Sequence, residues 1–379
     1  MDFGLTQQQQ LFQEMVREFA EKEVAPRAAE VDEEACFPAE TVRMMGKLGL
    51  MGVTIPEAYG GAGADTICYA IAVEEISRAC ASTGVIMSIN NSLVCDSIHT
   101  FGAEEQKRRL LIPLARGEKL GCYCLSEPDA GSDAANLQLT ARAEGNHFLL
   151  NGVKNFITNG QEANIAIVFA TVDRQLKHKG ISAFLVEKGT PGFGVLKVEK
   201  KLGIRGTSCC QLLFENCRVP RENLLGGIGE GFNIAMASLD GGRIGIAAQA
   251  VGIARAAYEA ALGYAKGRVQ FGQPIASFQA IQFMLADMAT TIDAARLLAY
   301  RAAILRDQGI QYGLEASMAK LYASEVAMCV TTKAIQIYGG YGYITDYPVQ
   351  RYFRDAKVTE IYEGTSEIQR LVIAGHLVG

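Results

Sequence analysis

The chain has 379 residues, of which 49% are hydrophobic and 20% are charged, and this balance excludes a disordered protein. Its net charge of -5 argues against nucleic acid as a partner. No apolar run approaches the roughly 20 residues that a membrane-spanning helix needs.

The cysteines and histidines give no sign of a metal site. Cys122 and Cys124 are two residues apart and Cys209 and Cys210 are adjacent, so neither pair has the spacing of zinc ligands. The ten cysteines are expected to be reduced thiols, because the amino-terminal residues lack the apolar core of a signal peptide. They also lack the Arg-rich face of a transit peptide. We therefore expect a cytoplasmic protein of a prokaryote or, alternatively, a processed chain in the mitochondrial matrix.

Residues 1–118 are predicted to form an N-terminal helical domain. Apolar residues recur at helical spacing between Phe12 and Phe19, after a Thr6 cap. Further helices are expected at 39–46, 67–79, 86–101 and 104–116. The glycine-rich loop at 56–65 lacks GxGxxG spacing and a flanking strand, so it is interpreted as a connector.

Residues 119–226 are predicted to form a β domain. Apolar and polar residues alternate over 137–143, and a turn at 144–146 leads into further alternation, which predicts a hairpin. Short apolar runs follow at 165–170, 181–186 and 211–214, without the long helices that parallel strands need as crossovers. We therefore expect an antiparallel barrel or sandwich.

Residues 227–379 return to a helical pattern. The Ala-rich run over 232–268 has apolar residues on most faces, as a helix inside a bundle does. Further helices are predicted at 278–308, 312–338 and 365–377. The fold class is therefore α+β and multidomain, with a central antiparallel β domain between an N-terminal helical domain and a C-terminal four-helix bundle.

The stretch 354–370, RDAKVTEIYEGTSEIQR, places the carboxylate of Glu363 at a break between two helices. Gly364 ends the first helix, and Thr365 or Ser366 can cap the second. A carboxylate on such a turn is held rigidly and can face a cavity, which suits a general base. From spacing alone, a surface glutamate beside a helix cap is the more common alternative.

Several segments, in chain order, make the sequence resemble the acyl-CoA dehydrogenase family. In that family the glutamate of a Tyr-Glu-Gly-Thr run, here 362–365, removes the substrate α-proton. The other matching segments are CLSEPDAGSDA (124–134), FITNG (156–160), LDGGRIGIAAQA (239–250), RVQFGQPIASFQ (268–279) and QIYGGYGY (336–343). The resemblance covers essentially the whole chain. It is strongest to short-chain (butyryl) members, through ACASTGVIMSINNSL (79–93) and EIYEGTSEIQRLVIAGHL (360–377).

The resemblance implies FAD as the cofactor, contacted by two subunits of a homotetramer that is a dimer of dimers. The hydroxyls of Ser126 and Thr158 are expected to donate to the flavin, and Phe156 to pack against its ring. A plain core aromatic is the alternative for Phe156. The remaining positions that match cofactor contacts of the family are Tyr123, Leu125, Ser132, Ile157, Arg268, Phe271, Gln279, Gln336, Ile337, Gly339, Gly340, Thr365 and Glu367.

The resemblance also implies an acyl-CoA substrate. Glu363 would take the α-proton while the β-hydride passes to flavin N5, which gives a trans-2-enoyl-CoA, and an electron-transfer flavoprotein would accept the electrons. Some relatives carry the base at the position of Gly242, which cannot act, and this strengthens the assignment to Glu363. The matched substrate contacts are Ile89, Leu93, Ser132, Asp240, Arg243, Tyr362 and Gly364. For Arg243 a structural ion pair is the alternative.

Bulky residues at Met87, Ile89 and Leu93 predict a short acyl pocket for straight chains of about four to six carbons. The room beside Gly242 keeps a branched or small cyclic acyl group as an alternative. Asp96 lies where the family usually has an apolar or small residue. We expect it to face solvent or a neighbouring subunit, with a second acid in the pocket as the alternative.

Three other protein classes share this scaffold. An acyl-CoA oxidase usually carries an extra C-terminal domain, for which 379 residues leave no room. A flavin monooxygenase would lack the Tyr-Glu-Gly-Thr base. A non-catalytic flavoprotein scaffold gains no support from an intact base and flavin loop, and a visible spectrum of the purified protein would distinguish it.

Overall fold

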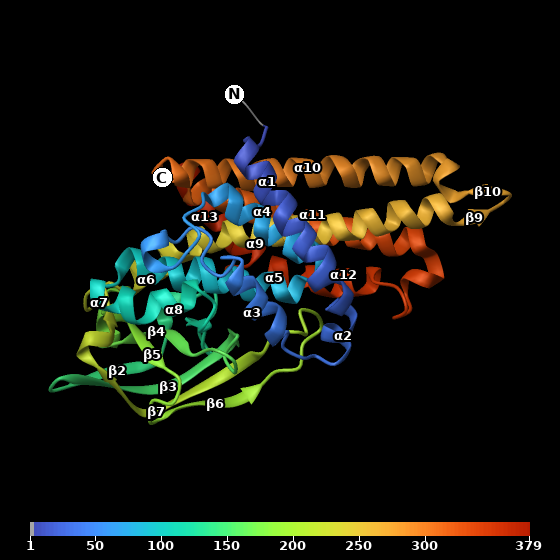
Figure 1. Cartoon of the computed structure of the whole chain (residues 1–379). Helices are drawn as coiled ribbons and strands as arrows, with labels where there is room; N and C mark the ends of the chain where they lie inside the picture. The colour runs from blue at the N-terminus through green and yellow to red at the C-terminus, as the bar shows by residue number, and fades with distance from the viewer. Residues whose placement is uncertain (1–3) are drawn as a thin grey trace.

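The structure is a computed structural model that describes residues 4–379. Residues 1–3, part of the stretch considered above for targeting signals, lie outside the described residues. The chain runs through helices, then a β domain, then helices again, as predicted. In Figure 1 the helices of both ends of the chain lie together above the β domain.

The N-terminal part is helical, and its first helix begins with the predicted Thr6 cap. The Thr6 hydroxyl accepts a hydrogen bond from Gln9 N at 3.2 Å, and the Gln9 side chain accepts one from Thr6 N at 2.9 Å. The α-helices are α1 (Gln7–Phe19), α2 (Ala28–Glu33), α3 (Ala39–Lys47), α4 (Thr66–Ala79), α5 (Ala81–Ser88), α6 (Asp96–Phe101), α7 (Glu104–Gln106) and α8 (Ile112–Ala115).

Two of the predicted helices are interrupted by π-helical segments, η4 (Ile89–Cys95) and η5 (Lys107–Leu111). In η4, polar side chains bond to carbonyls of the preceding helical turn. The Ser92 hydroxyl donates to Ser88 O at 2.8 Å, and the Asn91 amide donates to Met87 O at 2.9 Å. Such side-chain bonds compete with the regular helical pattern, which explains why the apolar periodicity overestimated the continuity of this helix.

Within the described residues, eight strands form one sheet in the order β6-β7-β3-β2-β4-β5-β8, with β1 beside β4. They are β1 (Gly121–Cys124), β2 (Thr140–Glu144), β3 (His147–Thr158), β4 (Ile165–Thr171), β5 (Ile181–Glu187), β6 (Phe193–Val198), β7 (Cys209–Pro220) and β8 (Leu224–Leu225). The β2–β3 hairpin confirms the predicted turn, and the pairing is mostly antiparallel. However, β1 pairs with β4 in parallel, and β2 pairs with β4 in parallel at one residue pair. The sheet is therefore not purely antiparallel, because a loop and a hairpin, rather than a helix, provide the crossover between β1 and β4.

The C-terminal part is a bundle of long helices. It comprises α9 (Gly231–Gly267), a hairpin of β9 (Val269–Gln270) and β10 (Gln273–Pro274), α10 (Gln279–Asp307), α11 (Gly313–Tyr338), α12 (Val349–Lys357) and α13 (Ser366–Val378). α12 lies before the point at Gly364 where the sequence predicted a helix to end, but it begins at Val349 and its α-helical part already ends at Lys357. It packs against α9 and α11 and completes the bundle.

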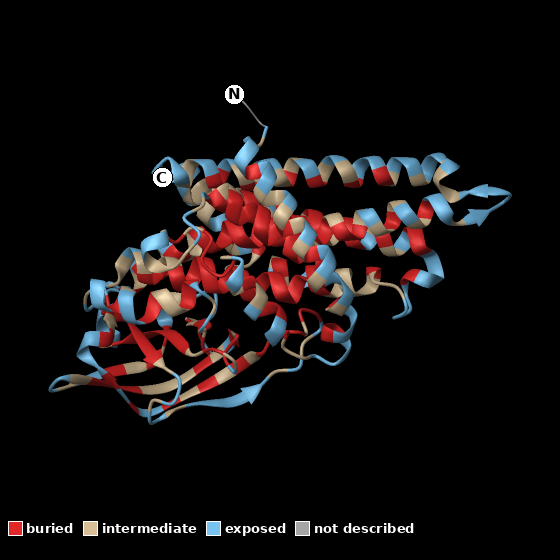
Figure 2. Ribbon diagram, in the orientation of Figure 1, coloured by how far each residue is buried: buried red, intermediate tan, exposed pale blue. Residues whose placement is uncertain are grey.

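The Ala-rich helix α9 lies at the centre of the molecule. It contacts α4 from the N-terminal part as well as α10, α11 and α12. Figure 2 shows buried residues concentrated where the helices of both ends meet. One hydrophobic cluster contains residues from all three parts of the chain, so the core is continuous across the predicted domain boundaries. None of the helices within residues 4–379 is long and apolar enough to cross a lipid bilayer.

Candidate active site

Glu363 lies on a left-handed turn that ends the 3-10 segment η11 (Val358–Glu360) and precedes α13. Its φ is 52°, and that of Gly364 is 93°. A residue with a side chain seldom adopts this conformation, and such strain concentrates at functional sites. Thr365 then caps α13, because its hydroxyl accepts a hydrogen bond from Ile368 N at 3.3 Å, as predicted.

The carboxylate of Glu363 is enclosed by protein. The residue as a whole is half-buried, but both carboxylate oxygens are buried and have no hydrogen-bond partner in the described chain. Burial raises the pKa of this carboxyl to about 7, against the opposing effects of Lys320 and Arg243. A buried and unpaired carboxylate is costly, so this side chain is placed to interact with something that the chain itself does not supply.

Gly242 on α9 provides the space for this carboxylate. A Cβ atom at position 242 would lie 2.1 Å from Oε2 of Glu363 and 2.9 Å from a methyl carbon of Leu93. Any side chain at position 242 would therefore displace the carboxylate. The glycine that cannot act as a base is what allows Glu363 to reach this place.

Polar side chains line the same region of α9. The Tyr362 hydroxyl donates to the side-chain carbonyl of Gln249, whose amide donates to Ala81 O at 3.0 Å. One helical turn before Gln249, Gly245 leaves room for the Tyr69 hydroxyl, which bonds to Ser88 Oγ at 2.8 Å. Sequence reasoning missed Gln249 and Tyr69. The polar Gln249 in an Ala-rich helix was a usable signal, whereas Tyr69 gave none.

Arg243 and Asp240 lie on the same stretch of α9. Arg243 Nη1 bonds to Asp240 Oδ1 at 2.5 Å and to Ser317 Oγ at 3.2 Å. The structural ion pair that was the alternative interpretation of Arg243 is therefore present. Arg243 Nε is buried and has no partner in the described chain, so the guanidinium retains one donor for a ligand.

The expectation that Asp96 faces solvent is wrong, because its carboxylate is paired within the chain. Asp96 Oδ1 accepts a hydrogen bond from Arg306 of α10 at 2.6 Å, and only 19% of its side chain is exposed. Gly241 permits this ion pair, because a Cβ atom there would lie 3.1 Å from Arg306 Nη1. The adjacent glycines Gly241 and Gly242 thus lie next to two different polar groups, the Arg306 guanidinium and the Glu363 carboxylate.

The predicted flavin contacts of the β domain lie on two adjoining segments. Tyr123, Leu125 and Ser126 are on β1 and the loop after it, and 156–158 ends β3. The buried Lys154 ties them together, because its ammonium donates to Leu125 O and Glu127 Oε1, both at 2.8 Å.

The exposure of the individual side chains shows which of the predicted flavin contacts can present a side chain to a ligand. Phe156 is 64% exposed, so the alternative of a plain core aromatic is wrong. Ile157 is only 2% exposed and packs in the core of the sheet, which leaves its main chain alone to contact a ligand. Ser132 and Glu367 are exposed.

The predicted dinucleotide contacts gather at the far end of the bundle. A cavity of about 440 Å³ is lined by Arg268, Ile337, Gly339 and Gly340 together with neighbouring residues. The Arg268 guanidinium lies over the Tyr341 ring, 5.4 Å from its centroid, and Gly339 has open space where a Cβ atom would stand. Phe271 is 93% exposed at the hairpin tip, and Gln279 and Gln336 are also exposed.

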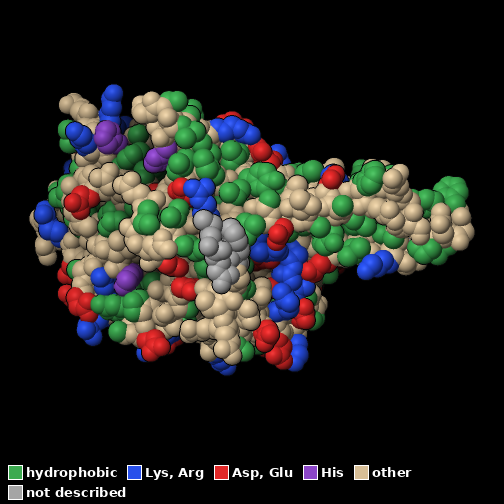
Figure 3. Space-filling model, turned by 90° about the horizontal axis from the view of Figure 1, so that it is seen from above, with side chains coloured by type: hydrophobic (Ala, Val, Ile, Leu, Met, Phe, Trp, Pro, Cys, Tyr) green, Lys and Arg blue, Asp and Glu red, His purple; other side chains and the backbone are tan. Residues whose placement is uncertain are grey.

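One chain does not bring the two sets of predicted cofactor contacts together. Figure 1 shows the β9–β10 hairpin projecting from the end of the bundle that is remote from the β domain, and Figure 3 shows this arm from above with few charged side chains.

The fold agrees with comparisons to known proteins. The chain matches the N-terminal domain of acyl-CoA dehydrogenases over residues 6–118, the middle domain over 122–217 and the C-terminal domain over 229–378. It therefore belongs to the acyl-CoA dehydrogenase family, and it is an enzyme of that class.

Particular relatives narrow the comparison. The chain is 55% identical to the short-chain specific acyl-CoA dehydrogenase of Clostridium acetobutylicum, with 100% of both chains covered. It is 56% identical to the human mitochondrial short-chain specific acyl-CoA dehydrogenase, over 99% of this chain and 91% of that protein. The structure of butyryl-CoA dehydrogenase from Megasphaera elsdenii is 47% identical and superimposes with a TM-score of 0.98, with 100% of both chains covered.

Proposed function

We propose that the protein dehydrogenates a short-chain acyl-CoA between C2 and C3, with Glu363 as the base that removes the α-proton. The observation that carries this proposal is the enclosed Glu363 carboxylate, whose oxygens have no partner in the described chain. Its pKa of about 7 suits a base that must accept a proton near neutral pH. Gly242 opposite the carboxylate supports the same assignment.

The main chain of Glu363 supports the reaction as well. The main-chain N–H of Glu363 has no acceptor within the described residues, and it belongs to the same residue as the carboxylate. We assign it to the thioester carbonyl, where a donor stabilises the negative charge that develops as the α-proton leaves. One such donor contributes about 3 kcal/mol to the transition state in comparable sites. The enclosure of the carboxylate excludes water and strengthens this interaction.

FAD is the proposed cofactor, and when bound it supplies the hydride acceptor. Ser126 and Thr158 offer hydroxyl donors, and the exposed Phe156 offers an aromatic face beside them. Arg268 and the open backbone at Gly339 would hold the dinucleotide from a second subunit, because the guanidinium fork matches phosphate oxygens.

The proposed substrate is a straight acyl chain of about four to six carbons, since Leu93 lies beside Gly242 and the base, and Ile89, one helical turn before it, is also buried. A preference of one to two carbons corresponds to a ratio in specificity of roughly tenfold to hundredfold. The test is kcat/KM for butyryl-CoA against octanoyl-CoA, with isovaleryl-CoA and cyclohexanecarboxyl-CoA alongside. Butyryl-CoA should be the best of the four. A preference for octanoyl-CoA would contradict the short pocket, and a preference for a branched or cyclic ester would favour the alternative.

The proposed assembly is a homotetramer, a dimer of dimers, and the proposed electron acceptor is an electron-transfer flavoprotein. The separation of the two sets of cofactor contacts within one chain supports shared sites. Mass measurement in solution tests the assembly, and a stable monomer that binds FAD tightly would refute it. We also propose domain boundaries at 118/119 and 226/227, and a location in a prokaryotic cytoplasm or, as the alternative, the mitochondrial matrix.

A further inference from the structure

Two lysines of the described chain are completely buried, and each donates to a main-chain carbonyl of the candidate site. Lys154 bonds to Leu125 O in the flavin loop and has the Glu127 carboxylate as its ionic partner. Lys320 of α11 bonds to Gly364 O at 2.7 Å, but within residues 4–379 it makes no ion pair. An ammonium buried without a contacting carboxylate is costly, so the position of Lys320 requires an explanation.

The main-chain carbonyls of Glu363 and Gly364 accept hydrogen bonds from side chains of two helices, α11 and α13. Lys320 Nζ bonds to Gly364 O, and the buried Gln369 amide of α13 donates to Glu363 O at 3.1 Å and to Gly364 O at 3.0 Å. A Cβ atom at Gly364 would lie 2.6 Å from Gln369 Nε2, so only glycine lets the amide approach. These three hydrogen bonds fix the peptide planes of a turn whose φ angles are both positive.

We propose that Lys320 is a positioning residue for the base: with Gln369 it clamps the turn at 363–364, and its charge favours the ionised form of the Glu363 carboxyl. This inference rests on the proposed function of Glu363 as the base. The clamp compensates for the unfavourable left-handed conformation of Glu363 and directs its side chain towards Gly242.

The charged surroundings of the turn support the second part of the proposal. Glu363 is faced by Lys320 from α11 and Arg243 from α9, and by the hydroxyls of Tyr69 from α4, Tyr123 from β1 and the adjacent Tyr362. The groups that face Lys320 are Glu363, Arg243, Glu360 and Glu367. Lys320 is the largest influence that opposes the burial of the Glu363 carboxyl.

The two groups titrate in adjacent ranges. Burial raises the pKa of Glu363 to about 7, and burial lowers the pKa of Lys320 to about 8. Between these values the carboxylate and the ammonium are both charged. Above them Lys320 loses its proton while the carboxylate stays ionised. The rate of the proton-abstraction step should therefore fall as the pH drops through the pKa of Glu363, and the charge of Lys320 sets where this acid limb lies.

The test compares Lys320→Met, Lys320→Gln and a control on the same helix, Lys333→Met, whose target lysine pairs with Asp287 near the surface. The FAD-loaded enzymes are mixed with butyryl-CoA, and the rate constant of flavin bleaching is followed against pH. Lys320→Met should lower the maximal rate by about tenfold or more and shift the acid limb upward by about one pH unit. Lys333→Met should match the wild type.

A second measurement needs no turnover. Amide hydrogen exchange over residues 358–370 of the substrate-free holoenzyme should be faster in Lys320→Met and intermediate in Lys320→Gln, whose amide is polar but one bond shorter than the lysine side chain. Lys320→Gln should nevertheless shift the acid limb as Lys320→Met does, because it also lacks the charge. Lys320→Met with wild-type exchange and a wild-type acid limb would overturn the proposal.

The two variants keep the outcomes distinct. If Lys320→Met does not fold, Lys320→Gln decides, and an unshifted acid limb in that variant overturns the role of the charge. If the wild-type enzyme itself does not bleach with butyryl-CoA, the proposed function fails. The exchange comparison still tests the clamp in that case.

Discussion

Gly242 and Glu363 come from distant parts of the chain, yet the missing side chain of one is the space filled by the other. A Cβ atom at 242 would lie 2.1 Å from Glu363 Oε2. We expect Gly242→Ala to lower kcat/KM by ~10²-fold or more, because a base displaced by an ångström loses its geometry. The fold should survive, since the displaced group is the end of a flexible side chain. Kinetics with the best acyl-CoA and a visible spectrum of the bound flavin measure both effects.

Gly263 provides the matched control for this prediction. It lies on the same helix and has nothing within 4 Å of a Cβ atom built there. Gly263→Ala should retain full activity and gain up to ~1 kcal/mol of stability from helix propensity. Equal activity of Gly242→Ala and Gly263→Ala would show that the base does not occupy the space beside α9.

Glu363→Gln should abolish dehydrogenation while retaining FAD, because a neutral amide cannot accept the proton. It should also change the pH dependence of stability. The folded-state pKa of Glu363 is raised to about 7 from 4.5, so its contribution to stability is fully present below pH 4.5 and is lost as the pH rises through 7. The Gln variant does not titrate, so its Tm relative to that of the wild type should rise as the pH is raised from 4.5 to 7. The relative change in the free energy of unfolding is up to ~3 kcal/mol. A Tm difference that does not vary with pH would contradict the raised pKa.

Asp96→Ala tests whether the Asp96–Arg306 ion pair is structural. The pair is 2.6 Å long and mostly enclosed, so its loss leaves the Arg306 guanidinium unpaired and should lower stability by ~1–3 kcal/mol. The ratio of kcat/KM for butyryl-CoA to that for octanoyl-CoA should not change. A changed ratio would revive the interpretation of Asp96 as a second acid in the acyl pocket.

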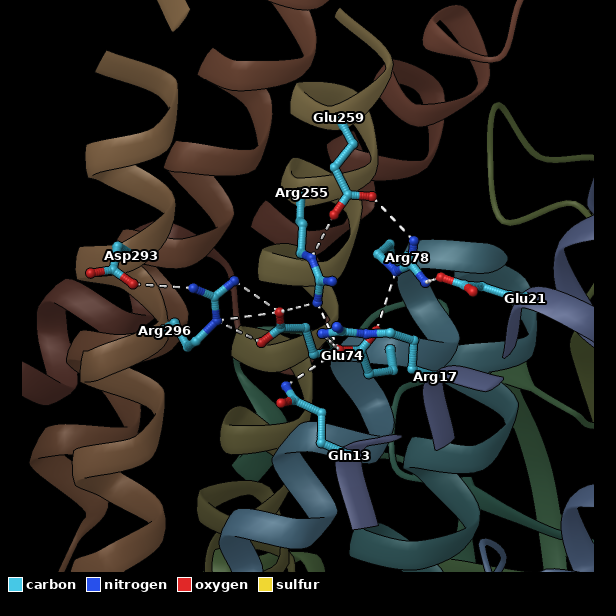
Figure 4. A network of polar contacts seen from close by, with 10 residues as sticks. Gln13, Arg17, Glu21, Glu74, Arg78, Arg255, Glu259, Asp293 and Arg296 are labelled. Carbon is cyan, nitrogen blue, oxygen red and sulfur yellow. Dashed lines mark hydrogen bonds and ion pairs between the residues drawn. The ribbon is translucent and has the colours of Figure 1, made fainter. Parts of the chain in front are cut away.

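A buried ionic network joins both ends of the chain, and Figure 4 shows Glu74 between Arg255 of α9 and Arg296 of α10. The adjacent Glu75 is fully buried and accepts hydrogen bonds from Arg17 and Arg255, both at 2.8 Å. We expect Glu75→Gln to lower stability by ~1–3 kcal/mol, because it removes a buried charge that Arg17 and Arg255 share, although Arg255 keeps Glu74 and Glu259 as partners. Calorimetry at pH 7 measures this. The exposed pair of Glu18 and Lys22 gives the control Glu18→Gln, which should change stability by less than ~1 kcal/mol.

The same variant has a defined pH dependence. Burial acts to raise the pKa of Glu75, but Arg17 and Arg255 outweigh it and lower the pKa below 4.5. The contribution of Glu75 is therefore present above pH 4.5 and lost as the pH falls through the lowered folded-state value. The Tm difference between wild type and Glu75→Gln should narrow in acid. A difference that widens in acid would contradict the assignment.

The order of the domains and most of the helices could be predicted from the sequence, because apolar periodicity and turn residues are local signals. The Thr365 cap was predictable for the same reason, since capping depends on a few adjacent residues. Interruptions such as η4 were not, because one of the partners of Asn91, Leu50 O, is brought to it by the fold. The position of the short helix α12 depends on its contacts with α9 and α11, which local residues do not specify.

Some residues of the candidate site could likewise be predicted from local sequence, and others could not. Glu363 was found through a motif, but its environment comes from residues that are far apart in sequence. Lys320 stands in an ordinary helical run, where a lysine normally faces water, and only the arrival of the 363–364 turn buries it. The Arg306 partner of Asp96 lies on another helix and has no sequence signal. Long-range contacts of this kind cannot be predicted from local patterns.

The contact of α4 with α9 has a consequence for how the protein is made. Helix α4 is almost entirely buried, and much of what covers it is α9. A ribosome must therefore synthesise the whole stretch from Ala79 to Gly267 before the cover is complete, which takes roughly 10–40 seconds at typical rates. During that interval the emerging N-terminal helices expose an apolar surface. This nascent segment should be a client of chaperones, and a chain that ends before α9 should aggregate rather than fold.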